Sequence, residues 1–269
     1  MKRYIGGKPF TFNDINSDFL KKYENYLRVE LKNKTNSIHT NLKFIRKVFN
    51  DAIRDETIEA NINPFSRFQL KLEKTQREYL TDEELEKFIT YKCPDNTKLQ
   101  LHQNMFVFAA YTGGMRVSDV LLLRWNDFTG THINFKIQKT GTQLSIKLPP
   151  KALDIILKYK AQNPKKDAFI FPMMKPDLDY SKPKILDAAI SSCTAYINKN
   201  LKIIAKNAEI GKHISFHISR HTWATRALRK GITIDKVSKL MGHAQIRETQ
   251  IYAKIVSEEL DKAMDVFND

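Results

Sequence analysis

His217-Ile218-Ser219-Arg220-His221 is the stretch from which both the fold and the chemistry of this chain can be worked out. Spacings of three and four residues place His217, Arg220 and His221 on one face of a helix. Histidines four residues apart suggest zinc, but the metalloprotease pattern needs a Glu directly after the first His, where this chain has Ile218. A phosphate fits better, because a guanidinium binds it bidentately and an imidazole can donate or accept a proton beside it. His221 is expected to support the phosphate-binding groups from behind, with simple packing or capping as an open alternative.

A second candidate phosphate seat is the segment Tyr111-Thr112-Gly113-Gly114-Met115-Arg116-Val117-Ser118-Asp119. The glycines end one helix and Arg116 begins the next, where the helix N-terminus itself favours anions. Asp119 follows one turn later and is placed to orient a catalytic side chain from behind. Taken alone, the segment is better explained by an ordinary glycine helix cap followed by a surface arginine.

The third segment, Leu240-Met241-Gly242-His243, leads to Tyr252, which on its own would be an ordinary half-buried aromatic residue. Together and in this order, the three segments resemble the sequence signature of the tyrosine recombinases, the phage integrase family. The resemblance covers the chain from about residue 78 onward. It implies a tyrosine-recombinase catalytic fold and the following assignments: phosphate-binding arginines Arg116 and Arg220, histidines His217 and His243, hairpin lysine Lys139, an acidic position at Asp119, and the nucleophile Tyr252.

The chemistry of such a constellation is coherent in its own right. A free tyrosine has a pKa of about 10, so forming phenolate at pH 7 costs about 4 kcal/mol. Arg116 and Arg220 can clamp the non-bridging oxygens and absorb the charge that gathers there. His217 can accept the phenol proton, His243 can hydrogen-bond an oxygen, and Lys139 can protonate the leaving deoxyribose oxygen. A covalent intermediate conserves the energy of the phosphodiester, so we expect neither a cofactor nor a metal.

The charge of the chain supports a polyanionic partner. Its 45 Lys and Arg against 30 Asp and Glu give a net charge of +15. Such an excess favours a nucleic acid as the partner, although some proteins are basic merely for solubility. The resemblance implies that this partner is double-stranded DNA. The two cysteines lie far apart and match no metal spacing, which fits a reducing compartment. Neither an apolar leader nor a run of about 20 apolar residues is present, so we expect a cytoplasmic, nucleoid-associated protein.

The N-terminal part is expected to be a small helical domain. Apolar spacing predicts helices over 14–31 and 36–54. The exposed face of the second carries cations, which are either DNA-binding residues or a solvated surface. A basic, unpatterned stretch then reaches 78, and Thr81 begins a new helix. We therefore expect a helical domain with its linker at 1–75 and a second domain at 76–269. The resemblance implies that the first is a core-binding, SAM-like domain, possibly incomplete, and that the second is the catalytic domain. The candidate DNA-binding residues are Lys43, Arg46, Lys47 and Arg77.

The second domain is predicted to be mainly α-helical with a small antiparallel β-sheet. Alternating residues at 133–137 and 144–148, separated by Gly141, predict a β-hairpin. Phe169-Ile170-Phe171 is a candidate third strand. Helices are predicted over the following ranges: 81–91, 99–111, 151–161, 184–207, 216–229, 233–241 and 257–267.

The resemblance also implies an assembly and a domain plan. Family members clamp the duplex between two domains, act as a tetramer on DNA, and often dock the last helix on a neighbour. The apolar stripe of that segment here is Ile255, Val256, Leu260, Met264 and Phe267. Folding back onto its own domain is an equal alternative. Family core-binding domains usually carry more helices, so we hypothesise a truncated or a reduced member.

The function that we expect is that of a site-specific recombinase or integrase of a mobile element, and two other functions compete with it. A type IB topoisomerase-like DNA relaxer would share the tyrosine and arginine chemistry. A DNA-binding regulator with a vestigial catalytic site would keep the basic charge alone. Every expected catalytic position holds a usable residue, which argues against the regulator. The segment from Leu240 to His243 favours the recombinase over the relaxer.

Overall fold

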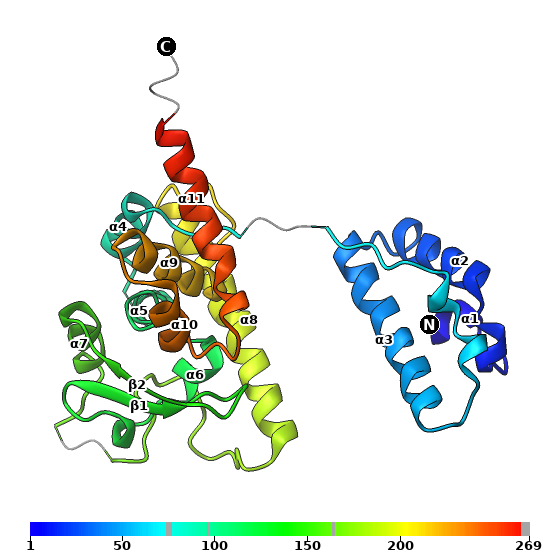
Figure 1. Ribbon diagram of the computed structural model, residues 1–269. Coiled ribbons are helices and arrows are strands. Elements are labelled where there is room, and N and C mark those ends of the chain that lie inside the picture. The colour runs from blue at the N-terminus through cyan, green and yellow to red at the C-terminus, as the bar shows by residue number, and fades with distance from the viewer. Residues whose placement is uncertain (74–76, 96, 163–164, 265–269) are drawn as a thin grey trace. The chain divides into compact units, whose positions relative to one another are not determined.

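The computed structural model describes residues 1–73, 77–95, 97–162 and 165–264. It divides into two compact units, Met1–Gln76 and Arg77–Asp269. Most of the chain is helical, and a single two-stranded antiparallel sheet is found among the described residues (Figure 1). The predicted fold class, mainly α with a small antiparallel sheet, is confirmed. Each unit has its own hydrophobic core.

The N-terminal unit is built on two long helices, α2 (Ser17–Val29) and α3 (Thr35–Arg54), after a short α1 (Lys2–Ile5). Asn16 caps α2 by accepting a hydrogen bond from the backbone N–H of Phe19 (2.9 Å). The predicted helix started three residues earlier, at 14, where the chain instead forms a separate 3-10 turn, Phe12–Asp14. The facing sides of α2 and α3 bury the following side chains: Leu20, Tyr23, Leu27, Ile38, Leu42, Ile45 and Phe49.

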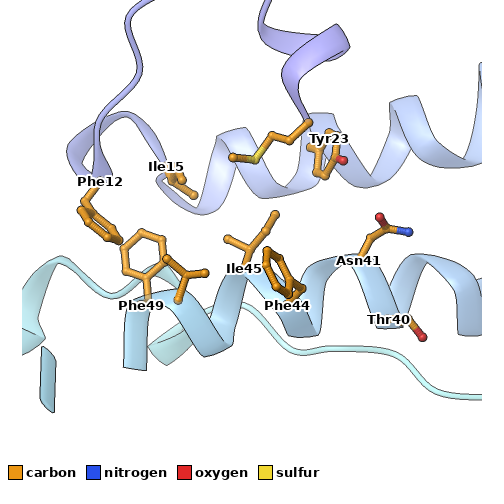
Figure 2. A pocket seen from close by; sticks show the side chains of 10 residues that line it. Phe12, Ile15, Tyr23, Thr40, Asn41, Phe44, Ile45 and Phe49 are labelled. Atoms are coloured by element: carbon orange, nitrogen blue, oxygen red, sulfur yellow. The ribbon is translucent and has the colours of Figure 1, made fainter. Parts of the chain in front are cut away.

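One face of α3 is apolar yet open to solvent. Phe44 is 68% exposed and Val48 is 40% exposed. They line a pocket of about 400 Å³ with residues of the 3-10 turn and of α2, among them Phe12 and Tyr23 (Figure 2). The predicted DNA-binding cations of this helix are exposed as well. Helix α3 therefore presents both an apolar and a basic surface.

The second unit contains the hairpin and the remaining helices. Its elements are α4 (Asp82–Thr90), α5 (Leu99–Tyr111), α6 (Val117–Leu122), β1 (His132–Lys136), β2 (Gln143–Lys147), α7 (Pro150–Leu157), α8 (Pro183–Asn207), α9 (Phe216–Arg229), α10 (Ile234–Met241) and α11 (Gln250–Met264). Helix α5 is buried along nearly its whole length and packs against α7, α8 and α9. It forms the centre of the unit (Figure 1). The predicted start of α4 is confirmed, because Thr81 and Glu84 form a reciprocal capping box.

The hairpin forms as predicted, with Ile133 opposite Ile146 and Phe135 opposite Leu144. The predicted third strand is wrong. Phe169 makes only an isolated bridge with Arg124, so the segment lies against a loop and not against the hairpin. Its apolar residues instead contribute to the hydrophobic core, in which Ile170 and Phe171 are buried.

The last helix starts earlier than predicted. Helix α11 begins at Gln250 rather than at 257, so Tyr252 lies in its first turn. Residues 250–256 are rich in β-branched and aromatic side chains, which are weak helix formers. Packing of α11 against α9 overrides that preference. Predicted helix residues 265–267, and the side chains of Leu260, Met264 and Phe267 in the apolar stripe, lie outside the described residues. None of the described helices is long and apolar enough to span a membrane.

Candidate active site

Helix α9 brings His217, Arg220 and His221 to one place. It has the bounds that the sequence predicts, and Asn198 of α8 accepts a hydrogen bond from its first backbone N–H, that of Phe216 (2.8 Å). The helix packs against α5, α8, α10 and α11. Because it is enclosed on so many sides, its polar side chains must find partners inside the protein.

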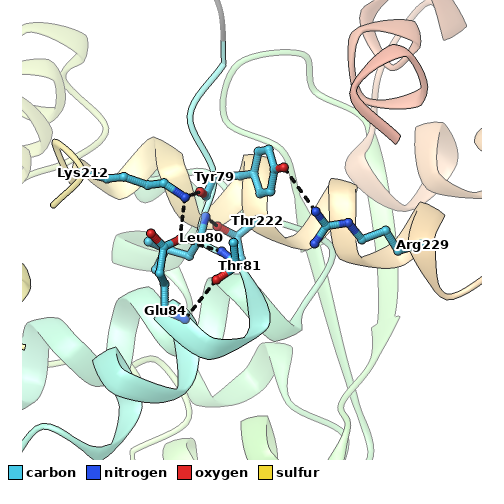
Figure 3. Close-up of polar contacts among 7 residues, drawn as sticks. All are labelled: Tyr79, Leu80, Thr81, Glu84, Lys212, Thr222 and Arg229. Atoms are coloured by element: carbon cyan, nitrogen blue, oxygen red, sulfur yellow. Dashed lines mark hydrogen bonds and ion pairs between the residues drawn. The ribbon is translucent and has the colours of Figure 1, made fainter. Parts of the chain in front are cut away.

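The start of the second unit is fastened to α9 (Figure 3). Leu80 N–H donates to Thr222 Oγ1 (2.9 Å), next to His221 in the sequence. Lys212 Nζ donates to Tyr79 O (2.9 Å) and to Glu84 (2.5 Å). Arg229 donates to the Tyr79 hydroxyl (3.2 Å). The residues that directly follow the linker are thus bound to the helix that carries the candidate catalytic side chains.

Thr222→Val is expected to lower the free energy of unfolding by about 1–3 kcal/mol, because the buried Leu80 N–H loses its acceptor. Thr225→Val is the matched control, since Thr225 is also fully buried on α9 but its hydroxyl has no partner among the described residues. That control is expected to be neutral or stabilising. Thermal unfolding of both variants measures the difference, and equal losses would contradict the role of Thr222.

Arg220 is the buried tie between three segments of the site. It is 3% exposed. Its Nη1 donates to Gly114 O (2.7 Å), and its Nη2 donates to Met241 O at the end of α10 (2.8 Å). Gly114 has φ +63°, and a Cβ there would lie 2.9 Å from Arg220 Cα. Only glycine permits this approach, so the helix-ending glycine of the sequence motif is needed to seat the arginine.

Gly114→Ala is expected to destabilise the protein by about 2–4 kcal/mol, since the positive φ and the clash with Arg220 both oppose the new methyl group. Gly231→Ala shares the positive φ (+80°) but meets no atom within 4 Å, so it isolates the cost of φ alone. Denaturant unfolding of the two variants gives the comparison. If both lose the same stability, the close approach to Arg220 is unimportant.

The two predicted phosphate-binding arginines lie together. Arg116, Asp119 and Arg220 surround the same tightly packed internal gap, which is too small for a water molecule. Nη1 of Arg116 is buried and has no hydrogen-bond partner among the described residues. Burial and the neighbouring charge of Arg116 lower the pKa of Arg220 to about 10, so the Arg220 guanidinium is still a cation at neutral pH. Buried, unpaired N–H donors on adjacent cations are suited to bind an oxyanion.

Asp119 fixes the loop that carries the predicted hairpin lysine. It is 4% exposed, and its Oδ1 accepts a hydrogen bond from Gln138 N–H (2.9 Å). Lys139 follows directly and is exposed. Burial raises the pKa of Asp119, while the Gln138 N–H and both arginines oppose that shift. The carboxylate thus holds the hairpin turn beside the arginine pair, as expected of a supporting residue.

The three histidines of the site are neutral at neutral pH. Enclosure by protein, and then nearby positive charge including that of Arg220, lowers the pKa to about 4 for His217, about 4 for His243 and about 3 for His221. His217 nevertheless remains exposed at the surface. The Nδ1 of His243 hydrogen-bonds Thr249 Oγ1 (2.7 Å). Sequence reasoning missed Thr249, because nothing in its spacing from His243 signals this contact.

Tyr252 is buried, at 2% exposure, and its hydroxyl lies 2.9 Å from Nδ1 of His221. Burial raises the pKa of Tyr252, against the lowering influence of Arg220, Arg77 and Arg116. The residue therefore lies within electrostatic reach of both phosphate-binding candidates. Sequence reasoning placed His221 behind the site and did not foresee its contact with the tyrosine.

The remaining predicted residues divide into two groups. Arg77 is exposed at the start of the second unit, and its charge acts on His217, His221 and Tyr252. Arg77 therefore lies near the candidate catalytic residues of the second unit, which the sequence did not indicate. The other three lie on the exposed face of α3 in the N-terminal unit: Lys43, Arg46 and Lys47. Among the described residues, no group of three or more His, Cys, Asp or Glu side chains could hold a metal ion.

A helical fold that gathers arginines, neutral histidines and a tyrosine in this way has the groups that an enzyme of phosphoryl transfer needs. Residues 78–259 match the phage integrase family, and residues 1–70 match the phage integrase SAM-like domain. The chain therefore belongs to the phage integrase family. It is a site-specific DNA recombinase or integrase that breaks and rejoins DNA strands.

Known relatives include tyrosine recombinases of bacteria. Tyrosine recombinase XerD of Rickettsia bellii is 24% identical over 275 residues, covering 97% of this chain and 86% of the relative. A tyrosine recombinase of Thermosipho africanus is 27% identical over 201 residues, covering 73% of this chain and 64% of the relative.

Solved structures share the fold at low sequence identity. XerH recombinase bound to a palindromic difH substrate has a TM-score of 0.70 at 18% identity, covering 99% of this chain and 76% of that one. A lambda integrase dimer bound to a core site has a TM-score of 0.68 at 19% identity, covering 93% of this chain and 84% of that one.

Proposed function

We propose that this enzyme cleaves double-stranded DNA by attack of Tyr252 on a phosphodiester, forming a 3'-phosphotyrosine bond, and then rejoins the strand. The observation that carries the proposal is the buried, unpartnered guanidinium nitrogen of Arg116 beside Arg220. A donor of Arg116 with no partner among the described residues, beside a second arginine and near a tyrosine, is what a covalent phosphoryl-transfer site requires.

The arginines would bind the non-bridging oxygens of the scissile phosphate. Arg220 is held in place by two backbone carbonyls, which use two of its five N–H donors. Arg116 offers a donor with no partner among the described residues. Arg220 is fixed before DNA arrives, so it needs little reorganisation as charge develops on the phosphate.

Two side chains would transfer protons, one to accept the proton of the nucleophile and one to protonate the leaving group. Neutral His217 accepts the proton of the Tyr252 hydroxyl, helped by the bound phosphate, whose charge offsets the arginines that lower its pKa. As the bond between phosphorus and the tyrosine oxygen forms, the bond to the departing deoxyribose oxygen breaks. Lys139 on the exposed hairpin turn gives that oxygen a proton. With Nδ1 of His243 engaged by Thr249, its Nε2 is left to bind a phosphate oxygen.

DNA and further copies of the chain are the partners that we propose. Related structures are of recombinases bound to DNA, one of them a dimer. By analogy, the N-terminal unit binds the duplex as a core-binding domain, with Lys43, Arg46 and Lys47 facing the phosphate backbone, and the second unit is the catalytic domain. Recombination would proceed in a tetramer of this chain, as part of the integration of a mobile element.

A suicide substrate tests the proposal. Duplexes tiled across the DNA that flanks the gene, each with a nick near the candidate cleavage point, trap a covalent adduct because the short cleaved strand diffuses away. We expect an adduct that digestion maps to the tryptic peptide Glu248–Lys254, in which Tyr252 is the one tyrosine. Adduct formation at another peptide would refute the mechanism. Relaxation of any plasmid without paired sites would favour a topoisomerase-like activity instead.

A further inference from the structure

Helix α9 carries two histidines on one face, and they differ sharply in exposure. His217 is exposed, whereas His221, one turn further along, is 4% exposed. Their rings meet edge to face with centroids 4.5 Å apart. The Tyr252 hydroxyl lies on the buried histidine, at 2.9 Å from Nδ1 of His221. Among the described contacts, the exposed histidine makes no hydrogen bond to the tyrosine.

The surroundings of Tyr252 hold it away from solvent. Its ring belongs to an apolar cluster with Ala224, Ala227, Val237 and Met241. At 2% exposure, the residue offers almost no surface to a duplex. A phosphodiester approaching from outside meets exposed groups such as His217 and Lys139 first. The hydroxyl must therefore shift from the buried to the exposed side of the histidine pair before it can attack.

His221 is poorly suited to take the proton of Tyr252 itself. Burial, and then the charges of His217, Arg77 and Arg220, lower the pKa of His221 to about 3. An imidazolium at this position would be buried among cations. A neutral imidazole can still hydrogen-bond the neutral phenol, and that bond stabilises the protonated, inactive form of the tyrosine.

We propose that His221 is a positioning residue that holds the Tyr252 hydroxyl in a buried resting position, and that this hydrogen bond breaks before the tyrosine attacks DNA. The inference rests on the proposed role of Tyr252 as the nucleophile. It makes the contact a property of the resting enzyme that slows cleavage. A residue that supported attack directly would have the opposite effect on the rate.

Two substitutions at His221 separate these possibilities. In His221→Asn the amide group takes the place of Nδ1 and keeps a hydrogen bond to the hydroxyl, whereas His221→Leu has a similar volume but no polar atom. Single-turnover adduct formation is measured on the nicked duplex at saturating protein. We expect His221→Leu to be about fivefold faster than wild type, the loss of one ground-state hydrogen bond. His221→Asn is expected to stay near the wild-type rate.

The outcomes are decisive in both directions. Structural damage lowers a rate, so acceleration in the leucine variant alone supports a resting contact. A slower leucine variant, or equal rates in all three proteins, would overturn the proposal. If wild type formed no adduct, or if the adduct persisted in Tyr252→Phe, the proposed function itself would fail. If the adduct depends on Tyr252 but its rate of formation is the same in the His221 variants, only the proposed role of His221 fails.

A second measurement does not depend on the leucine variant folding. Nitrogen-15 NMR of the histidine rings, with His221 assigned by its absence in His221→Asn, reports the hydrogen bond in the wild-type sequence. Tyr252→Phe is expected to shift the His221 nitrogen signals in the free protein and to leave them unchanged in the DNA-bound protein. Identical His221 signals in the two free proteins would overturn the proposal.

Discussion

Tyr252→Phe is expected to abolish covalent attachment to DNA, with a fall in adduct formation of at least about 10³-fold. The phenyl ring lacks the oxygen that would bond to phosphorus, and no other side chain stands in its place. DNA affinity should stay within about twofold, because the arginines and the rest of the binding surface are unchanged. The comparison is made by denaturing electrophoresis for the adduct and by gel shift for binding.

Two controls accompany this variant: the same substitution at another tyrosine, and the stability of Tyr252→Phe itself. Tyr196→Phe removes a hydroxyl from α8, where the residue is 45% exposed, and should leave the adduct at the wild-type level. The free energy of unfolding of Tyr252→Phe should change by no more than about 1 kcal/mol, the worth of its bond to His221. An adduct that persists in the variant would remove Tyr252 as the nucleophile.

Much of the fold could be predicted because its signals are local. Thr81 and Glu84 stand three residues apart, so a capping box can be inferred from the sequence. The hairpin shows its alternation and its glycine turn within a short stretch. The predicted start of α11 and the predicted strand at 169–171 were both wrong, and for the same reason. In both, contacts with distant elements, α9 and the loop at Arg124, decide the backbone.

In the candidate site, too, local features could be predicted from the sequence and contacts between distant residues could not. Arg220 and His217 could be placed together because they share a helix, and the glycines before Arg116 indicate a tight turn. The contact of His221 with Tyr252 joins residues 31 apart in the chain, and local spacing says nothing of it. The influence of Arg77 on the site depends on how the start of the unit is bound to α9, which is likewise a tertiary property.

Arg220→Lys is the second change with a large expected effect. An ammonium group on a flexible stem cannot reproduce the planar fork that meets Gly114 O and Met241 O and still faces the phosphate. At least one buried carbonyl would lose its donor, at a cost of about 1–3 kcal/mol in stability. We expect single-turnover cleavage to fall by about 10²–10³-fold, the usual loss for one preorganised charge donor.

Burial makes the loss worse for lysine than for arginine. The guanidinium keeps its charge here because its pKa falls only to about 10. A lysine starts from a lower reference pKa of about 10.4 and would lose charge under the same desolvation. Cleavage by Arg220→Lys should therefore weaken further as the pH rises from 7 to 9, unlike cleavage by wild type. Arg226→Lys on the same helix keeps its ion pair with Asp82 and should show neither effect. A pH-independent loss in Arg220→Lys would mean that geometry alone, and not charge, is what the buried arginine supplies.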